Sequence, residues 1–165
     1  MTQKIDAFRN VLSRFASGVT VVSAYRDDAA DGVTVSAFSA LSLDPPLVLA
    51  CIGKESDCYE LLATSERFAV NLLSNRQASL ALAFAELGEA KARALRAFPG
   101  VWSHESAPLL SDCVAHILCR RQAVYSAGDH NILVGEVVDL ALRDAGVEPL
   151  VYFAGEFRRL APQSH

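Results

Sequence analysis

The spacing of apolar residues near the start of the chain predicts one amphipathic helix over 6–15. Apolar side chains recur there at intervals of three and four residues, which places them on one helical face: Phe8, Val11, Leu12 and Phe15. Asp6 is suited to cap the N-terminus, because a carboxylate accepts hydrogen bonds from the free backbone N–H groups of the first turn. Gly18 ends this pattern.

After Gly18 the pattern changes to short runs rich in β-branched and other apolar residues, which are typical of strands. Residues 47–52 are continuously apolar, so this strand is expected to be buried on both faces. Polar turns are expected at 27–32 and 127–129, and Asp44-Pro45-Pro46 breaks the second strand. The expected strands are 19–25, 33–43, 47–52, 68–73, 114–123, 131–142 and 150–157.

Helical patterns interrupt the strands at 59–65 and 75–86, and the charged, alanine-rich stretch 89–97 fits a helix or an exposed loop. Many short strands separated by turn signals favour a closed β-barrel or a sandwich over a sheet of alternating strands and helices. The 165 residues fit one domain, 1–165, that is mainly β with flanking helices.

The charge pattern excludes some classes of protein. The net charge is −4 with no basic stripe, so a nucleic-acid partner held by phosphate contacts is not expected. No apolar run approaches the roughly 20 residues that a membrane span requires. The N-terminus lacks the pattern of a signal peptide, so we expect a cytoplasmic protein without membrane contact.

The four cysteines have no spacing typical of a zinc site and lie among apolar residues, so buried free thiols are expected. The chain contains no Gly-x-Gly, P-loop lysine motif, nucleophile elbow or His-Glu-x-x-His. A nucleotide would therefore have to bind to another architecture.

Hydroxyl side chains concentrate along the second predicted strand. Thr34, Ser36 and Ser42 share one parity and would face one side of the strand, whereas Ser39 has the other parity. Hydroxyls on a barrel wall can hydrogen-bond a phosphate or a ring carbonyl. A partly solvated strand face explains the same pattern.

Three other stretches hold candidate residues. Lys54 and Ser56 follow a buried strand and could hold a phosphate, although a lysine after a turn is more often simply exposed. Ser74 or Asn75 could cap the next helix or bind an anion at its N-terminus. His130 lies beside a tight turn, where an imidazole can donate to a ligand, and no carboxylate is fixed in relation to it as a triad requires.

Five segments, taken in order, resemble the flavin reductase-like family, the small reductase components of two-component flavin monooxygenases. Together they span about 8–160. The segments are RFASGVTVV (14–22), TVSAFSALSLDPPLV (34–48), RFAVNLLS (67–74), GDH (128–130) and LVYFAGEFR (150–158).

The resemblance implies an antiparallel Greek-key split β-barrel of the FMN-binding type, acting as a homodimer with FMN or FAD near the interface. The segment that includes Thr34, Val35, Ser36, Ala37, Ser39 and Ser42 would contact the isoalloxazine and ribityl chain. Cys51, Ile52 and Gly53 would run beside the ribityl chain. Lys54, Ser56 and Tyr59 would lie at the phosphate. His130 would face the nicotinamide, and Asn71, Tyr152, Phe153 and Arg158 would complete the cofactor-binding set.

The implied reaction is hydride transfer from NADH or NADPH to the flavin, with reduced flavin passing to a separate oxygenase. The cofactors carry this chemistry, which explains why no acid–base constellation is visible. The sequence leaves open whether the flavin is a tight cofactor or a diffusing substrate. Two alternatives remain: a flavoprotein on the same barrel that reduces a corrinoid or a quinone, and a non-enzymatic module that binds flavin or haem.

Overall fold

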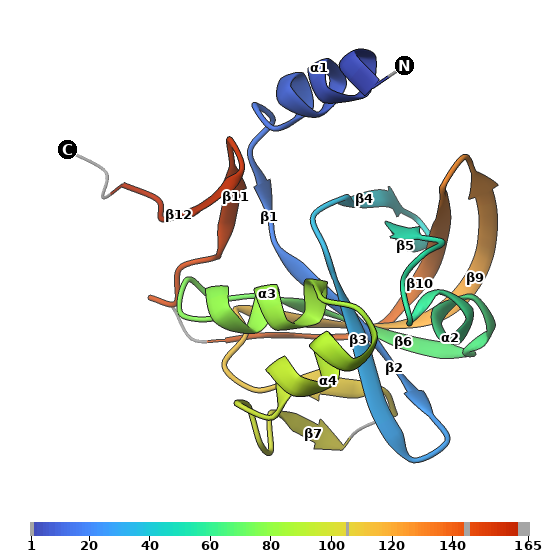
Figure 1. Ribbon diagram of the computed structural model, residues 1–165. Helices are drawn as coiled ribbons and strands as arrows, with labels where there is room; N and C mark the ends of the chain where they lie inside the picture. The colour runs from blue at the N-terminus through green and yellow to red at the C-terminus, as the bar shows by residue number, and fades with distance from the viewer. Residues whose placement is uncertain (1, 105, 144–145, 162–165) are drawn as a thin grey trace.

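A seven-stranded antiparallel sheet curls into a split barrel in the computed structural model, which describes residues 2–104, 106–143 and 146–161 (Figure 1). The sheet order is β3-β2-β6-β9-β10-β5-β4. Its strands are β2 (Thr20–Arg26), β3 (Ala29–Val35), β4 (Phe38–Leu43), β5 (Pro46–Gly53), β6 (Arg67–Leu72), β9 (Ala115–Ala127) and β10 (His130–Leu142).

The strands β3 and β4 follow each other in the chain but lie at opposite edges of the sheet. The sheet must therefore curl so that the two-residue link between them can join its edges. The Cys51 amide of β5 donates to the carbonyl of Ala37 in this link, at 2.9 Å. Hairpins of consecutive strands are joined by pairs that are distant in sequence, β2 with β6 and β10 with β5, which is the expected Greek-key arrangement.

Two apolar clusters stabilise the fold. The first fills the barrel and is built around Phe68, Leu62 and Leu133. The second, around Phe84 and Leu110, packs α3 (Ala78–Ala85) onto the outside of the sheet, where α4 (Gly88–Leu95) and the hairpin β7–β8 (Trp102–His104, Pro108–Leu110) also lie. The short α2 (Tyr59–Thr64) closes one end of the barrel with Leu61 and Leu62 buried.

The structure corrects several sequence expectations. Residues 47–52 are not buried on both faces: Val48, Ala50 and Ile52 face the core, while the alternate side chains of β5 remain partly exposed. The expected strand 33–43 is two strands, and the turn expected at 27–32 is only Asp27-Asp28, because β3 already pairs with β2 at Ala29. The expected strand 150–157 is also divided, into β11 (Val151–Phe153) and β12 (Glu156–Arg158).

The N-terminal helix α1 (Thr2–Leu12) stands apart from the barrel (Figure 1). It begins before the expected cap at Asp6. Its apolar side chains are not covered by the described chain: Val11 is 70% and Phe15, just beyond its end, is 79% exposed. The segment after it, β1 (Ser17–Gly18), pairs with β11 and ties the helix to the C-terminal hairpin.

All four cysteines are free thiols, as the sequence predicted. Cys58, Cys113 and Cys119 are buried, but Cys51 is only half-buried because it projects from the open face of β5. Within the described residues, no helix is both long enough and apolar enough to span a membrane.

Candidate functional site

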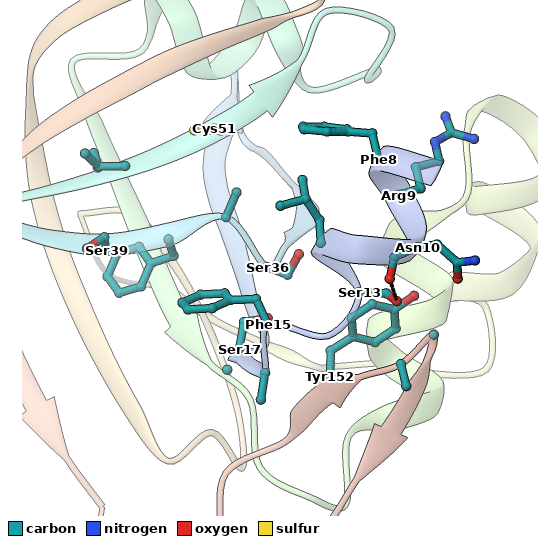
Figure 2. A pocket seen from close by; sticks show the side chains of 18 of the residues that line it. Phe8, Arg9, Asn10, Ser13, Phe15, Ser17, Ser36, Ser39, Cys51 and Tyr152 are labelled. Atoms are coloured by element: carbon teal, nitrogen blue, oxygen red, sulfur yellow. Dashed lines mark hydrogen bonds between the residues drawn. The ribbon is translucent and has the colours of Figure 1, made fainter. Parts of the chain in front are cut away.

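A cavity of about 1150 Å³ lies between α1, the strands β4 and β5, and the turn that joins β11 to β12 (Figure 2). The sheet forms one wall and the helix forms the other. This position, between an open sheet face and a separate helix, leaves room for a flat ligand.

The sheet wall combines small side chains with two larger apolar ones, Phe38 of β4 and Leu49 of β5. Ser36 and Ala37 come from the link between β3 and β4, Ser39 from β4, and Leu49 and Cys51 from β5. Cys51 reaches the cavity because the residues on either side of it, Ala50 and Ile52, point into the core. Small side chains allow a ligand to approach the backbone of this wall closely.

The opposite wall is aromatic. Phe8 and Phe15 project from the helical segment, and Tyr152 from β11 lies beneath them (Figure 2). The amide of Ala154 donates to the carbonyl of Ser13 at 2.7 Å, which fixes the β11–β12 turn against the end of the helix. Aromatic faces at these positions suit stacking or edge contacts with a planar ring system.

His130, the first residue of β10, lies on the same face of the sheet as Cys51, because its partner Gly53 is two residues beyond Cys51 on β5. It pairs with Gly53, and a β-carbon added at Gly53 would lie 3.7 Å from His130 Nε2. His130 Nδ1 is 2.7 Å from Asp129 Oδ1, and this hydrogen bond lowers the pKa of the Asp129 carboxyl. The glycine therefore leaves the imidazole lying against the backbone at the end of β5, with its ring half exposed.

The cavity includes five residues that the sequence proposed for cofactor binding: Ser36, Ala37, Ser39, Cys51 and Tyr152. The proposed Thr34, Ser36 and Ser42 do not share one strand face, because the chain leaves β3 after Val35 and a bulge lies between Ala40 and Ser42. Thr34 instead donates to the carbonyl of Ala81 in α3, at 2.6 Å. Thr34 and Ser42 do not line the cavity.

Three proposed residues are structural. Asn71 is fully buried; its Nδ2 donates to the carbonyl of Val21 at 3.0 Å, and its Oδ1 accepts from the amide of Leu110 at 2.8 Å. Val35 and Ile52 belong to the barrel core. The side chains of these three residues point away from the cavity, and their roles in cofactor binding stay predictions.

The proposed phosphate residues also lie outside the cavity. Tyr59 is on the core side of the sheet, where its hydroxyl accepts from Asn131 Nδ2 at 3.0 Å. Ser56 Oγ accepts from the amide of Cys58 at 3.2 Å, just before α2. The ammonium of Lys54 is bonded to the β9–β10 turn.

Of the C-terminal residues proposed from the sequence, Tyr152, Phe153 and Arg158, only Tyr152 lines the cavity. Phe153 alternates with Tyr152 along β11 and does not line it, and Arg158 pairs with Glu156 at 2.7 Å. The sequence missed the helical wall, including Phe8, Arg9 and Phe15. Their spacing predicted an amphipathic helix, and spacing alone does not tell an apolar face that covers a core from one that borders a cavity.

Comparisons with known proteins cover nearly the whole chain. A family model described as "Flavin reductase like domain" matches residues 12–161. The FMN reductase (NADH) SmoA of Agrobacterium fabrum is 39% identical over 160 residues, covering 95% of this chain and 87% of that protein. A reductase component of 4-nitrophenol 4-monooxygenase/4-nitrocatechol 2-monooxygenase from Rhodococcus opacus is 37% identical, covering 94% and 80%.

The fold has a matching solved structure. The NADH:FAD oxidoreductase SgcE6 of Streptomyces globisporus, in complex with NAD and FAD fragments, superimposes with a TM-score of 0.88 at 32% identity. The match covers 100% of this chain and 98% of that one.

Proposed function

The chain belongs to the flavin reductase like family, and from this premise we propose that it oxidises NADH and reduces FMN or FAD in the cavity between α1 and the sheet. The observation that carries the proposal is the match of one family over 12–161 together with a cavity in the same chain that is bordered by aromatic side chains. We extend the proposal to a single domain over 1–165 that acts in the cytoplasm.

The cavity fits a flavin. Its volume of about 1150 Å³ slightly exceeds that of common ligand pockets, which measure roughly 300–1,000 Å³. The aromatic residues Phe8, Phe15 and Tyr152 can pack against a tricyclic ring, and the small residues of β4 and β5 let polar ring atoms reach backbone groups. Ser36 and Ser39 can add hydroxyl hydrogen bonds.

A bound flavin supplies the acceptor for the hydride that the nicotinamide gives up. The contribution of the protein is to hold the two rings close together and to limit their motion. The sheet wall that includes Cys51 contacts one face of the flavin ring, while Phe8 and Phe15 limit access from the helical side. His130, beyond Cys51 on the same face, orients the nicotinamide by hydrogen bonding to it.

The reaction is tested by mixing the protein with FMN, FAD or riboflavin and then with NADH or NADPH, and following loss of the nicotinamide absorbance. We expect NADH to be oxidised with at least one flavin. No oxidation with any pair contradicts the proposal. Flavin absorbance in the purified protein without NADH oxidation would indicate a binding module instead.

The role of His130 has its own test. His130→Ala is expected to lower turnover at subsaturating NADH about tenfold or more, mainly through a higher KM for NADH, while flavin affinity measured by fluorescence titration stays unchanged, because the imidazole orients the nicotinamide rather than the flavin. Unchanged NADH oxidation in this variant would remove His130 from the mechanism.

We also propose that the reduced flavin passes to a separate oxygenase, because the Rhodococcus opacus relative is named as the reductase component of a monooxygenase. The cavity supports this proposal because it is open beside a helix that is not packed against the barrel. Reduced flavin that remains with the protein through gel filtration under anaerobic conditions would count against release.

A homodimer is the second part of the proposal. Large apolar side chains lie exposed on the helical segment and at strand ends: Val11 70%, Phe15 79%, Leu43 93% and Leu142 80%. Covering such side chains with a second copy would stabilise the dimer by about 25 cal/mol for each Å² of apolar area removed from water. Because Phe15 also borders the cavity, the partner copy would lie close to the flavin.

Sedimentation tests the dimer. Leu43→Asp should shift the protein towards monomer, because a carboxylate at the interface would be desolvated. Leu82→Asp is the matched control, since Leu82 is also an exposed leucine, at 59%, but lies on α3 rather than on α1 or β4. A wild-type protein that sediments as a monomer at micromolar concentration overturns the dimer and leaves the reductase proposal standing.

A further inference from the structure

Lys54 holds the turn that carries His130. It follows β5 directly, and its Nζ donates to Ser126 Oγ at 2.8 Å and to the carbonyl of Gly128 at 2.7 Å. Its backbone amide donates to the carbonyl of Asp129 at 2.9 Å. One residue thus bonds to the end of β9 and to both residues of the turn between β9 and β10, across a gap of more than seventy residues in sequence.

The turn needs such a support. Ser126, Gly128 and Asp129 are all exposed, at the tip of a hairpin whose two strands each have 13 residues. Gly128 has a positive φ of 62°, a conformation that glycine adopts without strain. Nothing apolar is buried at this tip, so hydrogen bonds rather than packing decide where it lies relative to β5.

The position of the turn determines the position of the imidazole. His130 is the residue that follows the turn, and its Nδ1 pairs with Asp129 Oδ1 at 2.7 Å. Asp129 is in turn held by the amide of Lys54. A shift of the turn would move both residues of the His130–Asp129 pair together relative to Gly53 and the cavity face.

We propose that Lys54 is a positioning residue for hydride transfer: its ammonium fixes the β9–β10 turn so that His130 lies over Gly53, ready to orient the nicotinamide. This inference rests on the proposed function of His130. It replaces the sequence expectation that Lys54 holds the flavin phosphate. Two of the three donors of the ammonium are already directed at the turn, and the residue does not line the cavity.

The test compares the variants Lys54→Met and Lys54→Arg. Lys54→Met removes a charged donor and its two hydrogen bonds to the hairpin. The KM for NADH should therefore rise about tenfold, with a smaller change in kcat. The dissociation constants of FMN and riboflavin should each change by less than about twofold, because no flavin contact is removed. Lys54→Arg should restore most of the KM, since a guanidinium also donates to two acceptors.

Two further variants separate this role from general damage. Ser126→Ala removes one acceptor and should give a smaller rise in KM, with no additional rise when combined with Lys54→Met. Arg120→Met is the matched control: Arg120 donates to Glu136 at 2.8 Å across the same hairpin, far from the turn. Its KM for NADH should equal that of the wild type.

A measurement on the flavin-free protein completes the experiment. Amide hydrogen exchange over 126–130 should be faster in Lys54→Met than in the wild type and unchanged in Arg120→Met. An unchanged KM for NADH would overturn the positioning role. A loss of affinity for FMN that riboflavin does not share would also overturn it, and would indicate that Lys54 binds the flavin phosphate. A wild-type protein that never oxidises NADH contradicts the proposed function instead, while the exchange result still reports whether Lys54 holds the turn.

Discussion

The ammonium of Lys91 donates to Oδ1 of Asp31 at 2.6 Å, with only 7% of the lysine side chain exposed. It also donates to Cys58 Sγ at 3.2 Å and lies 6.0 Å from the centre of the Phe84 ring. Burial lowers the pKa of Lys91, but the hydrogen bond to Asp31 and the electrostatic attraction to Cys58 and Asp31 together outweigh it, so the pKa is raised. This pair joins α4 to β3 and holds the outer helices on the sheet.

Removing Asp31 should lower the free energy of unfolding more than removing Lys91. Asp31→Ala leaves a buried, unpaired ammonium and should destabilise the protein by about 3 kcal/mol or more. Lys91→Met leaves a carboxylate that is 28% exposed and can be hydrated, so its cost should be smaller. Urea unfolding of both variants checks the order, and a greater loss in Lys91→Met would contradict it.

Gly135 is required by close packing within the barrel. A β-carbon there would lie 2.4 Å from Cζ of Phe68 and 2.8 Å from Cβ of Cys119, and both neighbours are buried. Gly135→Ala should therefore destabilise the protein by about 1–3 kcal/mol. Gly18→Ala is the control, because nothing lies within 4 Å of its added carbon. Thermal unfolding at one pH compares the two variants, and equal midpoints would show that the barrel can absorb the methyl group.

Asn71 should prove structural when it is changed. Asn71→Ala removes the acceptor of the Leu110 amide and the donor to Ser23 Oγ, both buried, and should cost about 1–3 kcal/mol. Flavin affinity of the folded fraction should stay the same, because the side chain is fully buried away from the cavity. Fluorescence titration well below the unfolding midpoint measures this. A specific loss of flavin affinity would indicate that Asn71 contributes to flavin binding.

The cysteines should differ in reactivity. Cys51 is half-buried at the cavity, whereas Cys58, Cys113 and Cys119 are buried. In the folded protein a thiol-specific reagent should modify Cys51 first, and FMN or FAD should slow that reaction by covering it. Mass mapping after brief labelling identifies the site. Labelling of Cys51 that flavin does not slow would contradict the placement of the ring beside β5.

Alkaline pH should weaken the fold through the buried thiols. Burial raises the pKa of Cys58, Cys113 and Cys119 to about 12, from an ordinary value of 9.0. The unfolded chain loses these protons above pH 9 while the folded chain keeps them. The contribution of the protonated thiols to the free energy of unfolding is therefore complete below pH 9 and is lost as the pH rises towards 12. Urea midpoints measured from pH 8 to 11 test this, and Cys119→Ala should show a shallower decline.

Local sequence patterns were sufficient for much of this protein. β-branched runs and turn residues located β2, β6, β9 and β10, because alternation and Gly, Pro or Asp breaks reflect backbone preferences that act over a few residues. The ordered motifs at 14–22, 34–48, 67–74, 128–130 and 150–158 indicated the family. The family match over 12–161 confirmed it.

Only the tertiary structure decided which side chains meet. Ser36, Cys51 and Tyr152 come together because the sheet curls and β11 pairs with β1, contacts between segments far apart in the chain. Strand parity misplaced Thr34 and Ser42 because β3 ends at Val35 and β4 contains a bulge, and both features interrupt the alternation of side chains. Likewise, a lone lysine after a strand carries no sign that its acceptors lie more than seventy residues away: Lys54 finds the β9–β10 turn only because β5 and β10 are neighbours in the folded sheet.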